Sequence, residues 1–343
     1  MPSTVVGISW NPPLNFAVAN AANEAHAGAL SPLRIGWSRW KAKPLVCAAM
    51  AATEDRSGLG HLSALAGVSC WSAGNIMVAR FDMPGLWIGF WRLTIGAVLY
   101  GLVLHLGGRR ISLATLRLVA PAAIVIACEI GIFFTALRTT TVANATIIGA
   151  LQPIVLLAVA SRRYRESVTA WLLGATLVAI AGIALVVQGS SSQSDWSLHG
   201  DILAFVAMFF FSAYFVLVKE IRHKVDTFTL QTASMAIGGV ALYPMAAIHA
   251  GTLAVPFPSW GQWAWLLVLL AVPGTGHFLM NWAHLHVSLS LTGLLTLAIP
   301  VISGIGAWFV LDERVTPVQG PGMVVVLAVL VVVIVRDARL ART

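Results

Sequence analysis

Long apolar stretches separated by short polar breaks fill the chain from residue 62 almost to its end. A membrane's hydrocarbon core, about 30 Å thick, needs about 20 apolar residues per helix, and the stretches have that length. We therefore predict an all-α integral membrane protein with ten transmembrane helices. Their expected positions are near 62–79, 85–106, 115–136, 142–160, 168–188, 201–218, 229–249, 262–283, 288–310 and 316–335.

The composition agrees with a membrane protein. Of the 343 residues, 58% are hydrophobic and 10% are charged, whereas a soluble domain is about 25% charged. The net charge of +8 is distributed in short clusters between apolar runs, so we expect a lipid bilayer as partner and no nucleic acid. The three cysteines form no CxxC pair or disulfide framework, and we expect neither a metal nor a cofactor.

The basic clusters alternate along the chain as the positive-inside rule requires. With the amino end in the cytoplasm, the outer loops contain only three arginines, and both termini are cytoplasmic. The inner loops and the tail hold Arg109, Arg110, Arg117, Arg162, Arg163, Arg165, Lys219, Arg222, Lys224, Arg336, Arg339 and Arg342.

The chain ends differ from the apolar body. Residues 1–60 are mixed, contain proline and lack a helical period, so we interpret them as a disordered cytoplasmic extension. The alternative is that synthesis begins at Met50, which leaves a short polar leader. Residues 337–343 form a cytoplasmic tail.

The two halves of the chain, 62–188 and 201–336, repeat one another. Matching positions are separated by a constant offset of 147 residues: Ala136 and Ala283, Pro153 and Pro300, Glu166 and Glu313, and Thr169 and Thr316. Because each copy has five spans, an odd number, the second copy is inverted in the membrane. Inverted repeats of this kind are common in secondary transporters, where the solute site lies near the midplane between the repeats.

Over residues 62 to about 336 the sequence resembles the EamA-type permeases of the drug/metabolite transporter superfamily. In each half the resemblance rests on a proline in the fourth span, an acidic residue before the last span, and a glycine-bearing last span, GATLVAIAGIALVV or GMVVVLAVLVVVIV. The segment CWSAGNIMVARF also resembles the first span of the family, and FWRLTIGAVLY resembles the second. In the second segment, Arg92 occupies a position where the family frequently has an arginine. The resemblance implies an inner-membrane permease, often an exporter of amino acids or other small metabolites, without an ATPase domain.

Arg92 and Glu129 are the charged residues that fit no loop. Each costs about 2.5–3.5 kcal/mol at the centre of a membrane helix, so each should face the bundle interior and have a partner. With a rise of about 1.5 Å per residue, both lie about 10 Å from the outer end of their spans, and we expect them to pair. The pair either fixes the second and third spans as a scaffold, or binds a charged solute, or lets Glu129 carry a proton.

The repeat places Gly276 at the position equivalent to Glu129, beside His277. A histidine titrates near physiological pH and is a candidate coupling group, although a buried histidine is more often hydrogen-bonded in a packed interior. Asn281, one turn further along, is its expected partner or a second cavity residue.

Trp71, Asn75 and Tyr214 lie on the matching segments CWSAGN and FFSAYF. We read them as candidate residues of a central cavity, with packing as the plainer alternative. The glycine-bearing faces of the fifth and tenth spans allow close helix packing, with homodimerisation as the minor alternative.

Pro153 and Pro300 are expected to bend their helices, since proline removes a backbone hydrogen bond and clashes with the preceding turn. Gln152 precedes the first of these prolines, where its amide can bond a freed carbonyl or a ligand.

No enzyme signature appears in the chain. HExxH, GxSxG and the phosphate-binding GxxxxGK[ST] are all absent, so any driving force for transport is a gradient. The sequence therefore indicates a secondary transporter of a small-molecule substrate, with Glu129 favouring proton coupling. The rival is a membrane sensor or assembly factor with a transporter-like fold.

Overall fold

Apolar helices form the fold shown by the computed structural model, which describes residues 42–140, 142–166, 168–190, 197–311 and 317–340. Throughout these ranges the regular structure is helical, with no strand. Residues Ala51–Thr343 form one compact unit.

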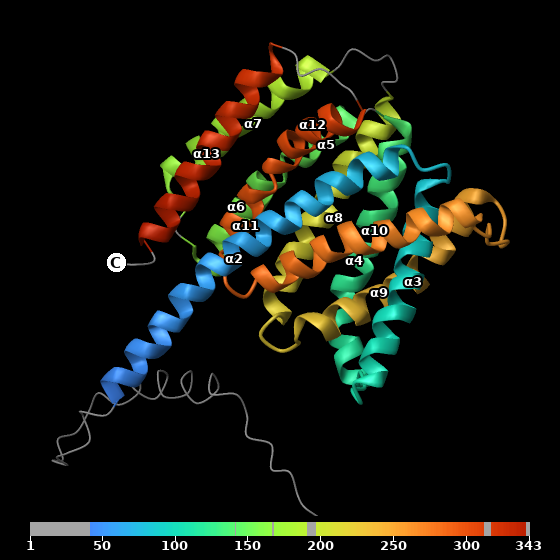
Figure 1. The fold of residues 1–343 in the computed structure, drawn as a ribbon, viewed down its shortest axis with the longest axis horizontal. Helices are drawn as coiled ribbons and strands as arrows, with labels where there is room; N and C mark the ends of the chain where they lie inside the picture. Colours follow the sequence, from blue (N-terminus) through green and yellow to red (C-terminus); the bar gives the residue numbers. More distant parts are fainter. Residues whose placement is uncertain (1–41, 141, 167, 191–196, 312–316, 341–343) are drawn as a thin grey trace, which may run out of the picture. The chain divides into compact units, whose positions relative to one another are not determined.

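The described helices follow one another with short connections (Figure 1). They are α2 (Ala42–Ala79), α3 (Gly85–Leu106), α4 (Leu113–Thr139), α5 (Val142–Gly149), α6 (Gln152–Tyr164), α7 (Ala170–Ser190), α8 (Leu198–Ile221), α9 (Thr227–Ala250), α10 (Trp260–Ala283), α11 (Leu289–Leu295), α12 (Ala298–Leu311) and α13 (Gln319–Leu340).

Among the described residues, six helical segments are long and apolar enough to cross a membrane: 58–79 of α2, and the whole of α3, α4, α8, α9 and α10. The predicted fifth and tenth spans contain the shorter apolar segments 170–185 and 320–336. The predicted fourth and ninth spans are each divided into two helices. The chain is thus an all-helical, multi-pass membrane protein.

The predicted extension 1–60 differs from the structure at its end. Helix α2 begins at Ala42, so residues 42–60 are helical rather than unstructured. The alanine-rich sequence there favours a helix, in spite of its mixed polarity. Residues 1–41 lie outside the described part of the chain.

Both interrupted helices break at the same point of the repeat. Helix α5 ends at Gly149 and α6 begins at Gln152, while α11 ends at Leu295 and α12 begins at Ala298. Pro153 and Pro300 lie in the first turn of the helix that follows each break, where a missing N–H costs no intrahelical hydrogen bond. The prolines therefore accompany an interruption of the helix in each half.

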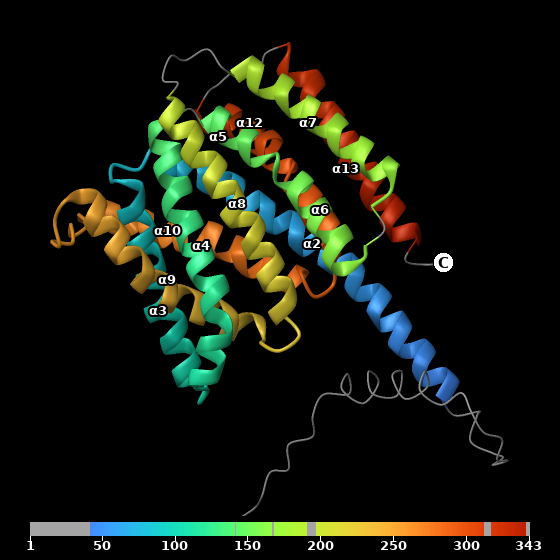
Figure 2. The same cartoon turned by 180° about the vertical axis from the view of Figure 1, so that it is seen from behind.

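Helices from the two halves pack against each other in matched pairs. Helix α3 contacts α9, α7 contacts α13, and α4 contacts α8; in the pair α2 and α10, the Ser63 hydroxyl donates to the Leu279 carbonyl oxygen at 2.8 Å. Both views show α7 beside α13 (Figures 1 and 2). At the closest approach of α2 to α10, a Cβ added to Gly276 would lie 2.8 Å from the Gly67 carbonyl oxygen, so glycine is required there.

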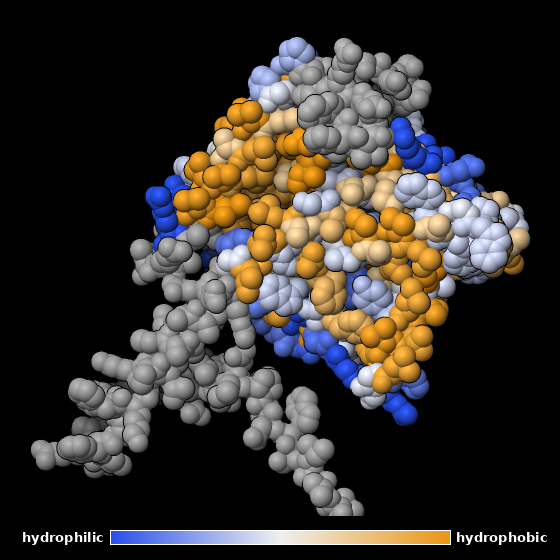
Figure 3. All heavy atoms as spheres, in the orientation of Figure 1, coloured by the Kyte–Doolittle hydropathy of each residue, from blue (hydrophilic) through white to orange (hydrophobic). Residues whose placement is uncertain are grey.

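Apolar side chains cover the outer faces of several helices. Figure 3 shows them gathered over the α7 and α13 pair and over α3. Exposed members include Leu177 on α7, Leu102 and Val103 on α3, and Val324 and Val331 on α13. Such faces are suited to lipid contact, because hydrocarbon chains solvate them without loss of hydrogen bonds.

A carboxylate in the loop after α6 holds the start of α11. Glu166 accepts hydrogen bonds from the backbone N–H groups of Leu289 and Ser290, both at 3.1 Å, and from the Ser290 hydroxyl at 2.6 Å. One side chain thereby connects the first-half loop to the broken helix of the second half.

Replacing Glu166 by Gln should lower the stability of the protein by about 2 kcal/mol, because hydrogen bonds to a charged acceptor are the stronger ones. Thermal unfolding in detergent measures the change. The matched control is Glu220→Gln, whose ion pair with Arg163 at 2.8 Å is largely exposed and should matter by less than about 1 kcal/mol. Equal effects of the two substitutions would show that Glu166 does not hold α11.

Candidate functional site

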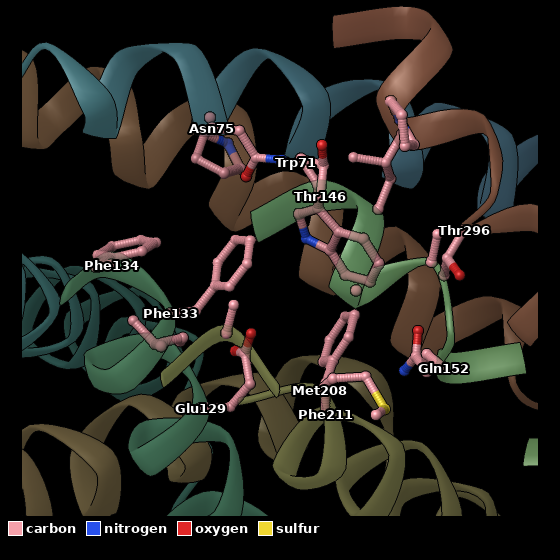
Figure 4. Close-up of a pocket in the computed structure, with 18 of the residues that line it drawn as sticks. Trp71, Asn75, Glu129, Phe133, Phe134, Thr146, Gln152, Met208, Phe211 and Thr296 are labelled. Atoms are coloured by element: carbon pink, nitrogen blue, oxygen red, sulfur yellow. The ribbon is translucent and has the colours of Figure 1, made fainter. Parts of the chain in front are cut away.

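A cavity lies between the two halves, at the level of both helix breaks. Its volume is about 90 Å³, enough for several water molecules or part of a small solute. Residues from both halves line it (Figure 4): Trp71, Gly74, Asn75, Arg92, Glu129, Ile130, Phe133, Phe134, Thr146, Gly149, Ala150, Gln152, Ala204, Met208, Phe211, Pro273, His277, Thr296, Ile299 and Pro300.

Arg92 of α3 and Glu129 of α4 both border this cavity, and both are buried, with 2% and 8% of their surface exposed. They attract each other electrostatically, but no nitrogen–oxygen contact within 4.0 Å joins these two described side chains. Arg92 Nη2 instead lies 3.3 Å from His277 Nδ1. The expected direct ion pair is therefore absent, because the guanidinium is oriented toward the imidazole.

His277 Nδ1 is contacted from three sides. Trp71 Nε1 donates to it at 2.8 Å, Arg92 Nη2 lies 3.3 Å away, and the Pro273 carbonyl oxygen of its own helix lies 2.9 Å away. His277 Nε2 is buried without a partner among the described residues. His277 thus joins α2 and α3 to α10 at the edge of the cavity.

Tyr214 and Asn281 lie outside the cavity that we expected them to share. The Tyr214 hydroxyl donates to Asn281 Oδ1 at 2.7 Å, and Asn281 Nδ2 donates to Gln231 Oε1 at 3.0 Å. Arg222 Nε donates to the Asn281 carbonyl oxygen at 2.6 Å. Since buried polar groups need partners, these side chains form a structural network between α8, α9 and α10.

The sequence did not predict several aromatic and small residues that line the cavity. Phe133, Phe134 and Phe211 provide its apolar wall (Figure 4). Gly149 and Thr296 border the two helix breaks, and their numbers differ by the repeat offset of 147. That offset was the signal that could have identified them.

Outside the membrane, an ion pair anchors the helix that carries Arg92. Arg109, which follows α3, binds Asp226 at the start of α9. Burial alone would raise the pKa of Asp226, but hydrogen bonds from Thr229 and Arg109 outweigh it and hold that pKa below its usual range. The carboxylate is therefore charged at neutral pH, and the ends of α3 and α9 stay together.

The fold and cavity define a multi-pass membrane protein whose two halves enclose a site with opposite charges. The sequence matches the EamA-like transporter family over residues 58–188 and 198–335, one match for each half. The chain belongs to this family. Its members are transporters, so the protein is a transporter-like membrane protein and not an enzyme.

Comparison with curated proteins found no match. Among solved structures, one described only as "Crystal structure of protein" superposes with a TM-score of 0.65 at 16% identity. The superposition covers 80% of this chain and 97% of that chain. At this identity the likeness shows the fold alone.

Proposed function

We propose that this protein is a secondary transporter that exports amino acids or other small metabolites across a bacterial-type plasma membrane by alternating access. In this proposal ten spans form two inverted five-helix repeats, with both termini cytoplasmic. The repeat relates α3 to α9 and α7 to α13, and the members of each pair contact each other. It also relates α2 to α8 and α10 to α4, so the contact of α2 with α10 has its equivalent in the contact of α8 with α4. These contacts support that symmetry. Alternating access follows when two similar halves exchange conformations around a fixed site.

One observation carries the proposal: a buried arginine and a buried carboxylate border a cavity between the halves. An intramembrane charge costs free energy, so such residues usually mark a solute or ion pathway. A scaffold ion pair would bring the two groups into contact. Arg92 and Glu129 make no such contact, and both remain available to a solute.

Glu129 borders the cavity and is the proposed site for a cationic group or a coupling proton. Replacing Glu129 by Gln should reduce solute export at least tenfold while leaving the amount of protein in the membrane unchanged. The assay is resistance of overexpressing cells to toxic amino acids, analogues and drugs, followed by uptake into vesicles. Normal export by E129Q at a normal protein level would remove Glu129 from the mechanism.

A further inference from the structure

The starts of two half-helices meet at the cavity. Helices α6 and α12 contain 13 and 14 residues, and their first turns contribute Gln152, Ile299 and Pro300 to the cavity wall. The start of a helix carries a partial positive charge and favours a negatively charged group nearby. Two such ends, related by the repeat, therefore act on one side of the cavity.

The side chain of Gln152 is a second, independent feature of this side. Only 1% of its surface is exposed, and its Nε2 donor has no partner among the described residues. Figure 4 shows Gln152 beside Thr296, with Glu129 in another part of the cavity. The Thr296 hydroxyl donates to the Gly293 carbonyl oxygen at 2.6 Å, so the free donor on this side is the Gln152 amide. A buried donor without an acceptor costs about 1–3 kcal/mol, which favours a ligand that accepts from it.

The balance of charge points to an anionic group. Arg92 and Glu129 both border the cavity, and their opposite formal charges offset each other there. On the other side, the Gln152 amide at the start of α6 is a buried donor without an acceptor among the described residues. We propose that this side, between the starts of α6 and α12, binds the carboxylate group of the transported solute, with Gln152 as hydrogen-bond donor. The statement that this solute is transported rests on the proposed function, while the binding of its carboxylate is tested separately.

Binding is measured on the purified full chain in lipid nanodiscs, with isocaproate and its neutral isostere isocaproamide as probes. A ligand that binds the folded state raises the unfolding temperature in a saturable manner, which gives the affinity. We expect isocaproate to bind at least tenfold more tightly than isocaproamide, because only isocaproate carries the charge that the helix starts favour.

Substitutions locate the carboxylate. Gln152→Leu should weaken isocaproate binding about tenfold and change isocaproamide binding less, and Gln152→Glu should weaken isocaproate further by repulsion. The control is Thr176→Val on α7. Among the described residues, this buried hydroxyl donates to the Leu172 carbonyl oxygen of its own helix, so the substitution should change the affinity for neither probe. The double variant R92Q/E129Q removes both charges together and tests whether the carboxylate binds Arg92 instead.

Isocaproate binding that Q152L and Q152E leave intact would overturn the inference. Loss of binding in R92Q/E129Q, but not in Q152L, would assign the carboxylate to Arg92 and overturn it as well, as would equal affinities for the two probes. Isocaproate binding without any solute exchange in vesicles would contradict the proposed function and leave this subsite standing. Solute exchange without preferential binding of isocaproate would support the proposed function and overturn this subsite.

Discussion

Replacing Arg92 by Gln should abolish solute exchange and lower the stability of the protein by about 3 kcal/mol, because it leaves Glu129 as an uncompensated charge in the membrane interior. The guanidinium is buried, contacts His277 Nδ1 at 3.3 Å and lies over the Phe134 ring at 5.8 Å. The double variant R92Q/E129Q should regain most of the lost stability, because no lone charge remains, but should not regain exchange.

Thermal unfolding in detergent and exchange in proteoliposomes measure the two effects separately. Arg92→Lys is the conservative control, since it keeps the charge and loses the planar donor geometry; it should be more stable than R92Q. If R92Q is as stable as the unmodified protein, or if the double variant exchanges solute at the original rate, the two charges do not act as described.

Replacing Gly276 by Ala should reduce solute exchange more than tenfold and destabilise the protein by about 2 kcal/mol, the usual cost of overpacking. The added Cβ would lie 2.8 Å from the Gly67 carbonyl oxygen and 2.9 Å from Trp71 Cδ1. Helices α2 and α10 must then separate, which removes Trp71 from its 2.8 Å hydrogen bond with His277. The reason for glycine at the position equivalent to Glu129 is this close approach of α2.

The matched control is Gly101→Ala on α3, where an added Cβ meets no atom within 4 Å. Alanine in an open helix position should be neutral or stabilise by up to about 1 kcal/mol. Exchange rate and unfolding temperature are compared for the two variants. A G276A protein that behaves like G101A would show that α2 and α10 do not need this contact.

Much of the arrangement around the cavity follows from the sequence. The offset of 147 residues aligns Pro153 with Pro300, and both prolines lie just after a helix break. The comparison of depths along the spans placed Arg92 and Glu129 at one level, and both border one cavity. Depth along a span and equivalence within the repeat depend only on spacing along the chain, so they can be predicted from the sequence.

The partners of individual side chains depend on helix rotation, which the pattern does not record. Arg92 contacts His277 rather than Glu129, and Asn281 bonds Tyr214 and Gln231 rather than His277. The division of the predicted ninth span at Leu295 and Ala298 was missed for a similar reason. Its residues are apolar on both sides of the break, so composition alone shows one continuous run.

Counterflow in proteoliposomes tests the central claim most directly. Vesicles containing the purified protein are loaded with an unlabelled solute from the resistance screen and diluted into a trace of the labelled solute. A transporter with one alternating site accumulates the label transiently above its outside concentration, and E129Q should show at least a tenfold smaller overshoot. A protein that binds the label without any overshoot would be a sensor or assembly factor, and that result would contradict the account.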